Sequence, residues 1–146
     1  MNTLSSLDLE QLVKQYGINN FNGIYSKDLV PSNLVQGWYI INLESHDKGN
    51  GTHWTCFKIT NDKLNIYFDS FNFIAPIMVS ELIAPYVYND KQIQDTMSSA
   101  CGFYCIACMN YIEKHNAVGD YLAFKDFVNA FSKNQDYNDN ILQRYL

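Results

Sequence analysis

The sequence predicts one α+β domain in which a small antiparallel or mixed β-sheet packs against helices. Three segments rich in β-branched and aromatic residues follow one another in the middle of the chain. Predicted helices precede and follow them, and one of these helices is apolar nearly all round. The 146 residues suffice for one hydrophobic core and are too few for two ordinary domains, so we expect a single domain over residues 1–146.

The first predicted helix begins after Ser5 or Ser6 and ends at Gly17. A serine before acidic first-turn residues, apolar residues at helical spacing and a terminal glycine are typical of a capped helix. The next segment, residues 19–33, contains asparagines, glycine and proline, and it is therefore predicted to be a loop.

The predicted strands cover residues 37–45, 53–60 and 64–73. A polar, glycine-containing turn separates the first two, and a tight turn at residues 59–63 separates the last two. Three such strands in succession favour an antiparallel meander.

Three helices are predicted after the strands. A short one covers residues 76–84, because Pro76 suits a helix start and Pro85 ends it. Residues 101–115 are almost continuously apolar and are expected to form the buried central helix. An amphipathic helix over residues 121–134 follows. Its packing residues are expected to be Leu122, Phe124, Phe127, Val128 and Phe131.

Composition excludes several classes of protein. No apolar run approaches the ~20 residues of a membrane helix, and no basic and apolar leader opens the chain, so we expect neither a membrane partner nor secretion. Four cysteines, three of them crowded into residues 101–108, suit a reducing compartment rather than a disulfide framework. A net charge of -5 argues against a broad basic surface for nucleic acid.

Cys101 is a candidate nucleophile because it lies at the predicted start of the central helix. A helix N-terminus stabilises negative charge, and such placement can lower a thiol pKa from ~8.5 to roughly 3.5–7.5. Gly102, the next residue, would leave room for a substrate backbone near the sulfur. The alternative is that Cys101, like Cys105 and Cys108, only packs in the core.

His53 and Asp69 are the candidate base and its orienting acid. His53 begins one predicted strand, and Asp69 lies near the end of the next. Because the start of one antiparallel strand and the end of its neighbour lie side by side, we expect the two side chains within hydrogen-bonding reach. Taken singly, a histidine is more often structural and an aspartate at a strand end is more often a turn residue. Their order along the chain favours catalysis.

Three windows, residues 51–59, 66–73 and 94–105, resemble the signature blocks of adenains, the adenovirus maturation proteases. That clan also includes the SUMO and ubiquitin-like-protein proteases, and its catalytic residues run in the order His, Asp or Glu, Gln, Cys. Residues 12–31 resemble the opening of the adenains through a Phe-x-Gly-x-Tyr-x-Lys pattern. The resemblance covers roughly residues 9–115.

The resemblance implies a role for each matching residue. His53 matches the general base, Asp69 the acid and Cys101 the nucleophile. Gln94, seven residues before Cys101, matches the side chain of the oxyanion hole. From composition alone Gln92 is an equal candidate, and the resemblance selects Gln94 by its distance from the cysteine.

Two further residues are assigned to the cleft. Trp54 matches the family's His-Trp pair, which implies an indole covering one face of the imidazole. A narrow cleft between Trp54 and Gly102 would reject a β-carbon, so cleavage after glycine is expected. The implied activity is that of a cysteine endopeptidase that processes capsid or core precursor proteins, in the virion and infected host cell of a DNA virus, with a virophage as the best candidate source.

The chain departs from the adenain pattern in ways that bear on cofactors. It has Asp69 where adenovirus enzymes have Glu, and Ser70 and Asn72 where they have Pro and Gly. Those enzymes are activated by DNA and by a viral peptide disulfide-linked to a cysteine upstream of the glutamine. Here no cysteine lies between Phe57 and Gln94, so covalent activation cannot operate in the same form, and the acidity does not suit activation by DNA. We therefore expect a protein substrate as the partner, and no cofactor.

Three other interpretations remain. Cys101, Cys105 and Cys108 share a helix face and could bind zinc with His115 or His46, although structural zinc sites prefer short Cys-x-x-Cys knuckles on turns. We expect no metal. The chain could instead be an inactive module that binds a ubiquitin-like tail. It could also be an active protease of host ubiquitin-like proteins, a branch that usually carries a larger substrate-binding surface.

Overall fold

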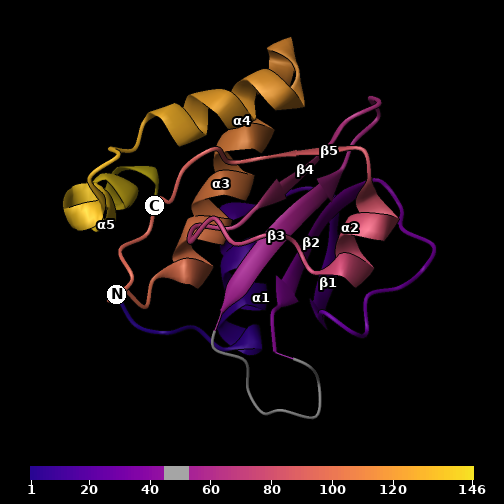
Figure 1. Ribbon diagram of the computed structural model, residues 1–146, viewed down its shortest axis with the longest axis horizontal. Helices are drawn as coiled ribbons and strands as arrows, with labels where there is room; N and C mark the ends of the chain where they lie inside the picture. Colours follow the sequence, from indigo (N-terminus) through magenta and orange to yellow (C-terminus); the bar gives the residue numbers. More distant parts are fainter. Residues whose placement is uncertain (45–52) are drawn as a thin grey trace.

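A five-stranded sheet with helices on both faces forms the part of the chain that the computed structural model describes, residues 1–44 and 53–146 (Figure 1). The predicted α+β class is confirmed. The predicted turn at residues 45–52 lies outside the described residues. The helices are α1 (Ser6–Tyr16), α2 (Ile77–Ile83), α3 (Cys101–His115), α4 (Asp120–Asn129) and α5 (Asn138–Leu142). The strands are β1 (Phe21–Ser26), β2 (Gly37–Asn42), β3 (Trp54–Ile59), β4 (Asn65–Phe68) and β5 (Tyr86–Tyr88).

Helix α1 begins with a reciprocal cap. The Ser5 hydroxyl accepts from the Asp8 backbone N–H at 3.1 Å, and the Asp8 carboxylate accepts from the Ser5 N–H at 2.9 Å. Two of the backbone donors that a helix start leaves unpaired are thereby satisfied. Gly17 ends the helix with a left-handed φ of 64°. The predicted first helix is confirmed.

The sheet is mixed. Its strands follow the order β1-β2-β3-β4-β5, and the three central ones form the predicted antiparallel meander. The outer strands pair in parallel, β1 with β2 and β5 with β4. Cys56 of β3 lies opposite Phe68 of β4, so the first residues of β3 and the last residues of β4 lie side by side at one end of these strands.

The predicted loop over residues 19–33 is wrong for residues 21–26, which form β1, and is confirmed for the residues on either side. The register of β1 against β2 shifts between Phe21 and Ile24, which marks a β-bulge. Gly23 lies in this bulge with a φ of 124°, which favours glycine. The asparagine and glycine residues that indicated a loop therefore mark an irregular strand.

The helices after the sheet follow the prediction with one shortening. Helices α2 and α3 form where expected. Helix α4 ends at Asn129 instead of continuing to residue 134. The buried Asn138 side chain accepts from the Ser132 N–H and donates to the Ser132 carbonyl, at 2.9 and 2.8 Å, so it holds the chain in a turn after the helix. Strand β5 and helix α5 were not predicted.

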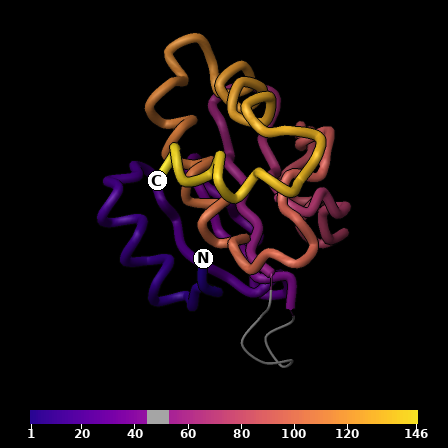
Figure 2. Tube along the Cα trace, turned by 90° about the vertical axis from the view of Figure 1, so that its left-hand side faces the viewer, coloured from indigo at the N-terminus to yellow at the C-terminus, as the bar shows by residue number. Residues whose placement is uncertain are grey.

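The core has two parts, one on each face of the sheet. The larger lies between the sheet and α1, α3 and α4, and the smaller lies under α2. Helix α3 is buried nearly all round, as predicted. Of the five residues expected to pack from α4, Leu122 is exposed and the other four are buried. The side view in Figure 2 shows α1 on the outside of the larger layer.

A buried lysine links the sheet to two helical segments. Lys58 of β3 donates to Glu113 at 2.6 Å and to Asp120 at 2.9 Å. The Trp38 indole N–H also donates to Glu113, at 3.1 Å. A buried charge is tolerated only when it is paired, and here it fastens α3 and the start of α4 to β3.

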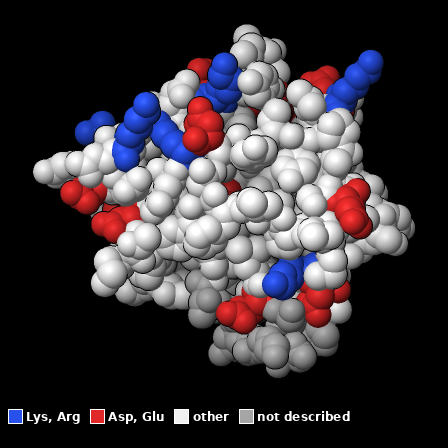
Figure 3. All heavy atoms as spheres, in the orientation of Figure 1, with Lys and Arg blue, Asp and Glu red and all other residues white. Residues whose placement is uncertain are grey.

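Charge is sparse on the face of the molecule shown in Figure 3. Lys, Arg, Asp and Glu lie around its margin, and its centre is almost uncharged. No basic band crosses this face at the residues that the structure describes. Among the same residues, no helix combines the length and the apolar character needed to cross a membrane.

Candidate active site

His53 and Asp69 meet at the edge of the sheet where β3 begins and β4 ends. His53 immediately precedes β3, and Asp69 immediately follows β4. The His53 Nε2 and an Asp69 carboxylate oxygen lie 2.6 Å apart, and both residues are buried. The structure thus brings together the pair that antiparallel pairing predicts. An ionised carboxylate can only accept, so Nε2 carries the shared hydrogen and Nδ1 remains for other chemistry.

The pKa of His53 is raised to about 9. Burial acts against the charged ring and would lower the pKa. The hydrogen bonds and charges of Asp69 and Cys101 outweigh burial and raise it. Among the described residues the buried Nδ1 has no well-formed hydrogen-bond partner, whereas the Cys101 side chain interacts with the ring. His53 is therefore arranged to hold a proton near neutral pH, between an acid on one side and a thiol on the other.

Cys101 is the first residue of α3, as predicted, and it receives a second backbone contribution from β3. The Trp54 N–H donates to its Sγ at 3.5 Å. One turn further along α3, the Cys105 thiol donates to the Trp54 carbonyl, also at 3.5 Å. The Trp54 backbone is thus held by two thiols, its N–H by Cys101 and its carbonyl by Cys105. Sequence reasoning missed this donor, because it depends on how β3 docks against α3.

The other three cysteines have a different environment. Cys56, Cys105 and Cys108 are buried, and burial raises the pKa of each thiol. Cys56 and Cys105 also interact with each other. None of the four cysteines, all of which lie in the described part of the chain, forms a disulfide. Cys101 differs from these three because its thiol interacts with the imidazole ring of His53.

Asp69 is held by groups that the sequence did not indicate. Its backbone N–H donates to the Asn89 side chain at 3.2 Å, and the Asn89 amide donates back to the Asp69 carbonyl at 2.7 Å. The Phe71 N–H donates to the carboxylate oxygen that faces His53, at 2.8 Å. Asn89 is buried just after β5, so its role depends on a strand that the sequence pattern did not reveal.

Gln94 is fully buried beside the loop that leads into α3. Its Oε1 accepts from the Ser70 hydroxyl at 2.6 Å, which fixes which end of the amide carries the N–H groups. Its Nε2 donates to the Ser98 carbonyl at 2.9 Å and, less closely, to the Ser98 hydroxyl at 3.3 Å. The neighbouring candidate Gln92 donates to the Gln94 carbonyl at 2.8 Å. Gln94 thus joins the segment after Asp69 to the segment before Cys101.

Two of the three substitutions relative to the adenain pattern, Ser70 and Asn72, have a structural counterpart. Ser70, in place of proline, supplies the hydroxyl that orients Gln94. Asn72, in place of glycine, has a left-handed φ of 63°, a conformation that asparagine adopts more readily than other non-glycine residues.

The loop before α3 is supported from the end of the chain. Asp139 of α5 accepts from the Ser98 hydroxyl and from the Tyr104 hydroxyl, each at 2.8 Å. The Ser98 hydroxyl in turn accepts from the Ala100 N–H at 3.2 Å. This support was not predicted, because α5 was not.

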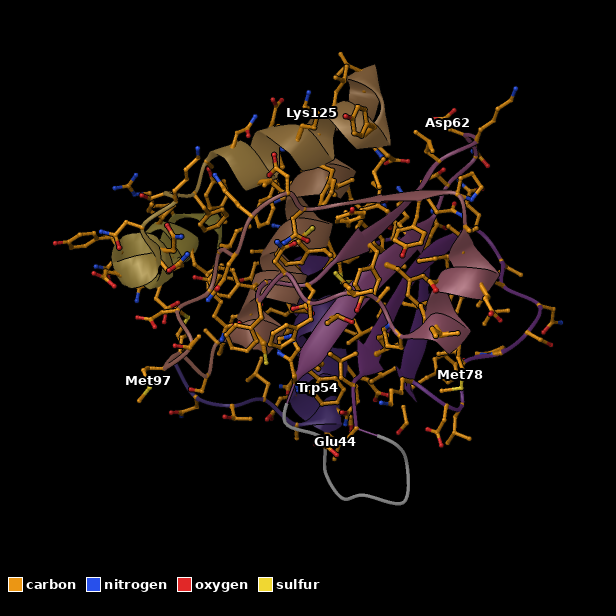
Figure 4. The ribbon with its side chains drawn as sticks, viewed as in Figure 1. Glu44, Trp54, Asp62, Met78, Met97 and Lys125 are labelled. Atoms are coloured by element: carbon orange, nitrogen blue, oxygen red, sulfur yellow. The ribbon has the colours of Figure 1, made fainter. Side chains whose placement is uncertain are left out.

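The structure places the two cleft residues differently from expectation. The rings in contact with His53 among the described residues are Phe71 at 4.6 Å and Phe73 at 6.0 Å between centroids. The Trp54 indole N–H donates instead to the Leu4 carbonyl at 2.9 Å. Figure 4 labels the Trp54 side chain at the start of β3. Leu4 also packs on Gly102. Leu4 therefore contacts both of the residues that were expected to form the narrow cleft.

The proposed zinc ligands do not form a metal site in the described residues. No group of three or more His, Cys, Asp or Glu side chains in residues 1–44 and 53–146 is arranged to hold a metal ion. The His115 ring stacks on Tyr111 with centroids 4.1 Å apart. His46, the other histidine considered, lies outside the described residues.

The arrangement as a whole combines groups that nucleophilic cysteine catalysis uses. It offers a thiol at a helix start, a buried imidazole held by a carboxylate, and a backbone donor to the sulfur. These contacts come from the segments at the start of β3, the end of β4 and the start of α3. A scan against protein-family models found none that matches this chain, and a search of the curated proteins also found no match.

Proposed function

We propose that this chain is a cysteine endopeptidase with Cys101 as nucleophile, His53 as general base and acid, and Asp69 as the orienting acid. The observation that carries the proposal is the buried arrangement of Asp69, His53 and Cys101 where β3 begins and β4 ends. Asp69 binds one nitrogen of His53 at 2.6 Å, and the Cys101 thiol interacts with the same ring. A structural histidine needs only one such partner. A ring held between a carboxylate and a thiol at a helix start suits catalysis.

The reaction would proceed by two acyl transfers. The Cys101 proton passes to His53 before the substrate binds, in keeping with the raised pKa of that ring, and the ionised sulfur then attacks the scissile carbonyl carbon. Protonated His53 then gives its proton to the leaving amine as the C–N bond breaks, which leaves a thioester on Cys101. His53 next takes a proton from water while the water oxygen attacks the thioester carbon, and the C–S bond breaks to release the acid and restore the thiol.

Gln94 is the proposed side-chain donor to the oxyanion. Its Nε2 carries two hydrogens, and the longer bond of 3.3 Å to the Ser98 hydroxyl is the weaker one. Charge developing on the substrate oxygen would attract that hydrogen more strongly than a neutral hydroxyl does. The shorter bond to the Ser98 carbonyl and the bond from Ser70 would keep the amide in place.

The proposed substrates are viral capsid or core precursor proteins, cleaved after glycine, and the proposed location is the virion and infected cell. This part rests on the resemblance of the windows around His53, Asp69 and Cys101 to the adenains. The contact of Leu4 with Trp54 and Gly102 removes the steric reason for a glycine preference at that place. The preference is kept because of the resemblance alone.

The test is cleavage of a peptide library containing Gly-Gly and Gly-Ala bonds, with new termini identified by mass spectrometry. We expect cleavage by the unmodified chain and none by Cys101→Ala. Cys108→Ala is the matched control, because Cys108 lies on the same helix and is buried but is not among the groups that interact with His53. Activity that survives Cys101→Ala would refute the proposal. Cleavage restricted to the tails of ubiquitin-like proteins would support the cysteine peptidase chemistry, but the substrates would then be ubiquitin-like proteins and not capsid or core precursors.

A further inference from the structure

The segment before α1 binds both parts of the chain that carry the candidate catalytic residues. The Met1 carbonyl accepts from the Ser99 hydroxyl at 2.7 Å, and Ser99 lies two residues before Cys101. The Leu4 carbonyl accepts from the Trp54 indole at 2.9 Å, and Trp54 directly follows His53. The first residues lie beside the loop that enters α3 in both Figure 1 and Figure 2. Residues 1–4 thus form a bridge, here named the N-terminal strap, between the nucleophile and the base.

The strap packs closely on the start of α3. A β-carbon added to Gly102 would lie 3.0 Å from Leu4 Cδ1 and 3.3 Å from Leu4 Cβ. The same β-carbon would lie 3.2 Å from the Leu9 side chain of α1, which is fully buried. Leu4 therefore meets Gly102 on the side of the hydrophobic core. This placement indicates a structural contact beneath the site, not a peptide lying across its open side.

Trp54 transmits the effect of the strap to the sulfur. Its indole is fixed by Leu4, and its backbone N–H donates to Cys101 Sγ. The Trp54 N–H belongs to the peptide group that His53 and Trp54 share, so any rotation there moves both the donor to the sulfur and the base. A shift of about 1 Å at reacting groups can lower turnover by about a hundredfold.

We propose that the N-terminal strap positions the catalytic groups, with Leu4 and Trp54 as positioning residues that act on kcat through the geometry of His53 and Cys101. This inference rests on the proposed peptidase function. The strap touches neither the sulfur nor the imidazole in any contact that the structure describes, so it contributes no chemistry of its own.

The test uses Leu4→Ala, which removes the packing on Gly102, and Trp54→Phe, which removes the indole donor and keeps an aromatic ring. We expect each to lower kcat by roughly tenfold to a hundredfold, with KM within about twofold of the unmodified value. Leu4→Met should restore most of the turnover. Leu7→Ala is the matched control, because Leu7 is exposed on α1 close in sequence to Leu4.

A second measurement needs no substrate. The rate at which iodoacetamide alkylates Cys101 is followed against pH, and the apparent pKa of this profile should shift in Leu4→Ala and Trp54→Phe but not in Leu7→Ala. The inference would be overturned if both variants kept the turnover and the pH profile of the unmodified chain. It would also be overturned if either variant turned over faster than the unmodified chain, because the strap would then be inhibitory. Lack of peptide cleavage by the unmodified chain would refute the proposed function. That outcome is distinguishable from failure of the strap inference, because alkylation of Cys101 is measured without a peptide substrate.

Discussion

The Gln94 amide shows how a buried hydrogen-bonded side chain can also serve a reaction. Its oxygen is committed to Ser70, and one N–H is committed to the Ser98 carbonyl at 2.9 Å. The remaining N–H makes only a long bond to a neutral hydroxyl. A glutamine in this state is already oriented, so an oxyanion would need to displace only the weaker bond.

This arrangement predicts that Gln94→Ala lowers kcat by about 10²–10³, because removal of one oxyanion donor acts on the transition state. KM should change little. Steady-state kinetics on a peptide found in the library screen would measure both constants. Alkylation of Cys101 by iodoacetamide should proceed as before, since that reaction forms no acyl oxyanion.

Gln92→Ala is the neighbouring control for this experiment. It removes a hydrogen bond to the Gln94 carbonyl but no donor that faces the reaction, and we expect turnover within about threefold of the unmodified chain. If Gln94→Ala is kinetically silent, or if both variants lose turnover equally, the oxyanion donor must be sought among the backbone N–H groups.

The raised pKa of His53 predicts how stability depends on pH. Its pKa is about 9 in the folded chain against an ordinary value near 6.5. Asp69 and Cys101 therefore stabilise the charged ring fully below pH 6.5, and this stabilisation is lost as pH rises through about 9. The free energy of unfolding should fall over this interval by about 2–3 kcal/mol.

Urea denaturation between pH 6 and pH 9.5 measures this fall. His53→Gln should flatten the curve, because glutamine does not titrate. His115→Gln is the matched control and should keep the slope, since that ring is exposed and stacks on Tyr111 away from Asp69 and Cys101. A slope unchanged in His53→Gln would contradict the assignment of the proton to His53.

Strand β3 owes its attachment to the helices partly to Lys58. The ammonium lies between Glu113 and Asp120, at 2.6 and 2.9 Å, and it is almost fully buried. Lys58→Met should destabilise the chain by about 3 kcal/mol, because the two carboxylates lose their partner while mostly buried. Urea denaturation measures the effect. Lys125→Met, at an exposed lysine on α4, should change stability by less than about 0.5 kcal/mol.

Destabilisation by Lys58→Met is expected to leave the candidate site intact below the unfolding transition. Lys58 lies in the interior of β3 and pairs with helices at positions away from His53. Loss of turnover in the folded variant would mean that α3 shifts along the sheet when the pair is removed.

Elements with a complete local signal were predictable from the sequence, and those without one were not. Helix α3 has fifteen residues that are mostly apolar, and α1 has both of its caps, so each was predicted correctly. Strand β1 has a glycine at its bulge, which resembles a loop. Strand β5 has three residues and α5 has five, too few for any periodicity to be recognised.

The candidate site likewise contains residues that the sequence pattern predicts and supporting residues that it does not. His53, Asp69 and Cys101 lie at ends of predicted elements, so the order of the elements was enough to bring the first two together. Their supports could not be predicted, because Asn89 and Asp139 follow or belong to elements that were missed. The Trp54 N–H and the strap depend on docking between distant segments, which no local pattern encodes. Whether these residues act in catalysis stays a prediction.

The positions of the contacting residues in the chain also set the order in which the site can assemble during synthesis. The His53–Asp69 contact is possible once Asp69 has been added, whereas the Ser99–Met1 and Trp54–Cys101 contacts wait for Ser99 and Cys101. At about 5–20 residues per second, these roughly 30 further residues take about 2–6 seconds. A nascent chain therefore carries the base and its acid well before it carries a nucleophile. Under the proposed function, a nascent chain that still lacks Cys101 would cleave neither itself nor its neighbours.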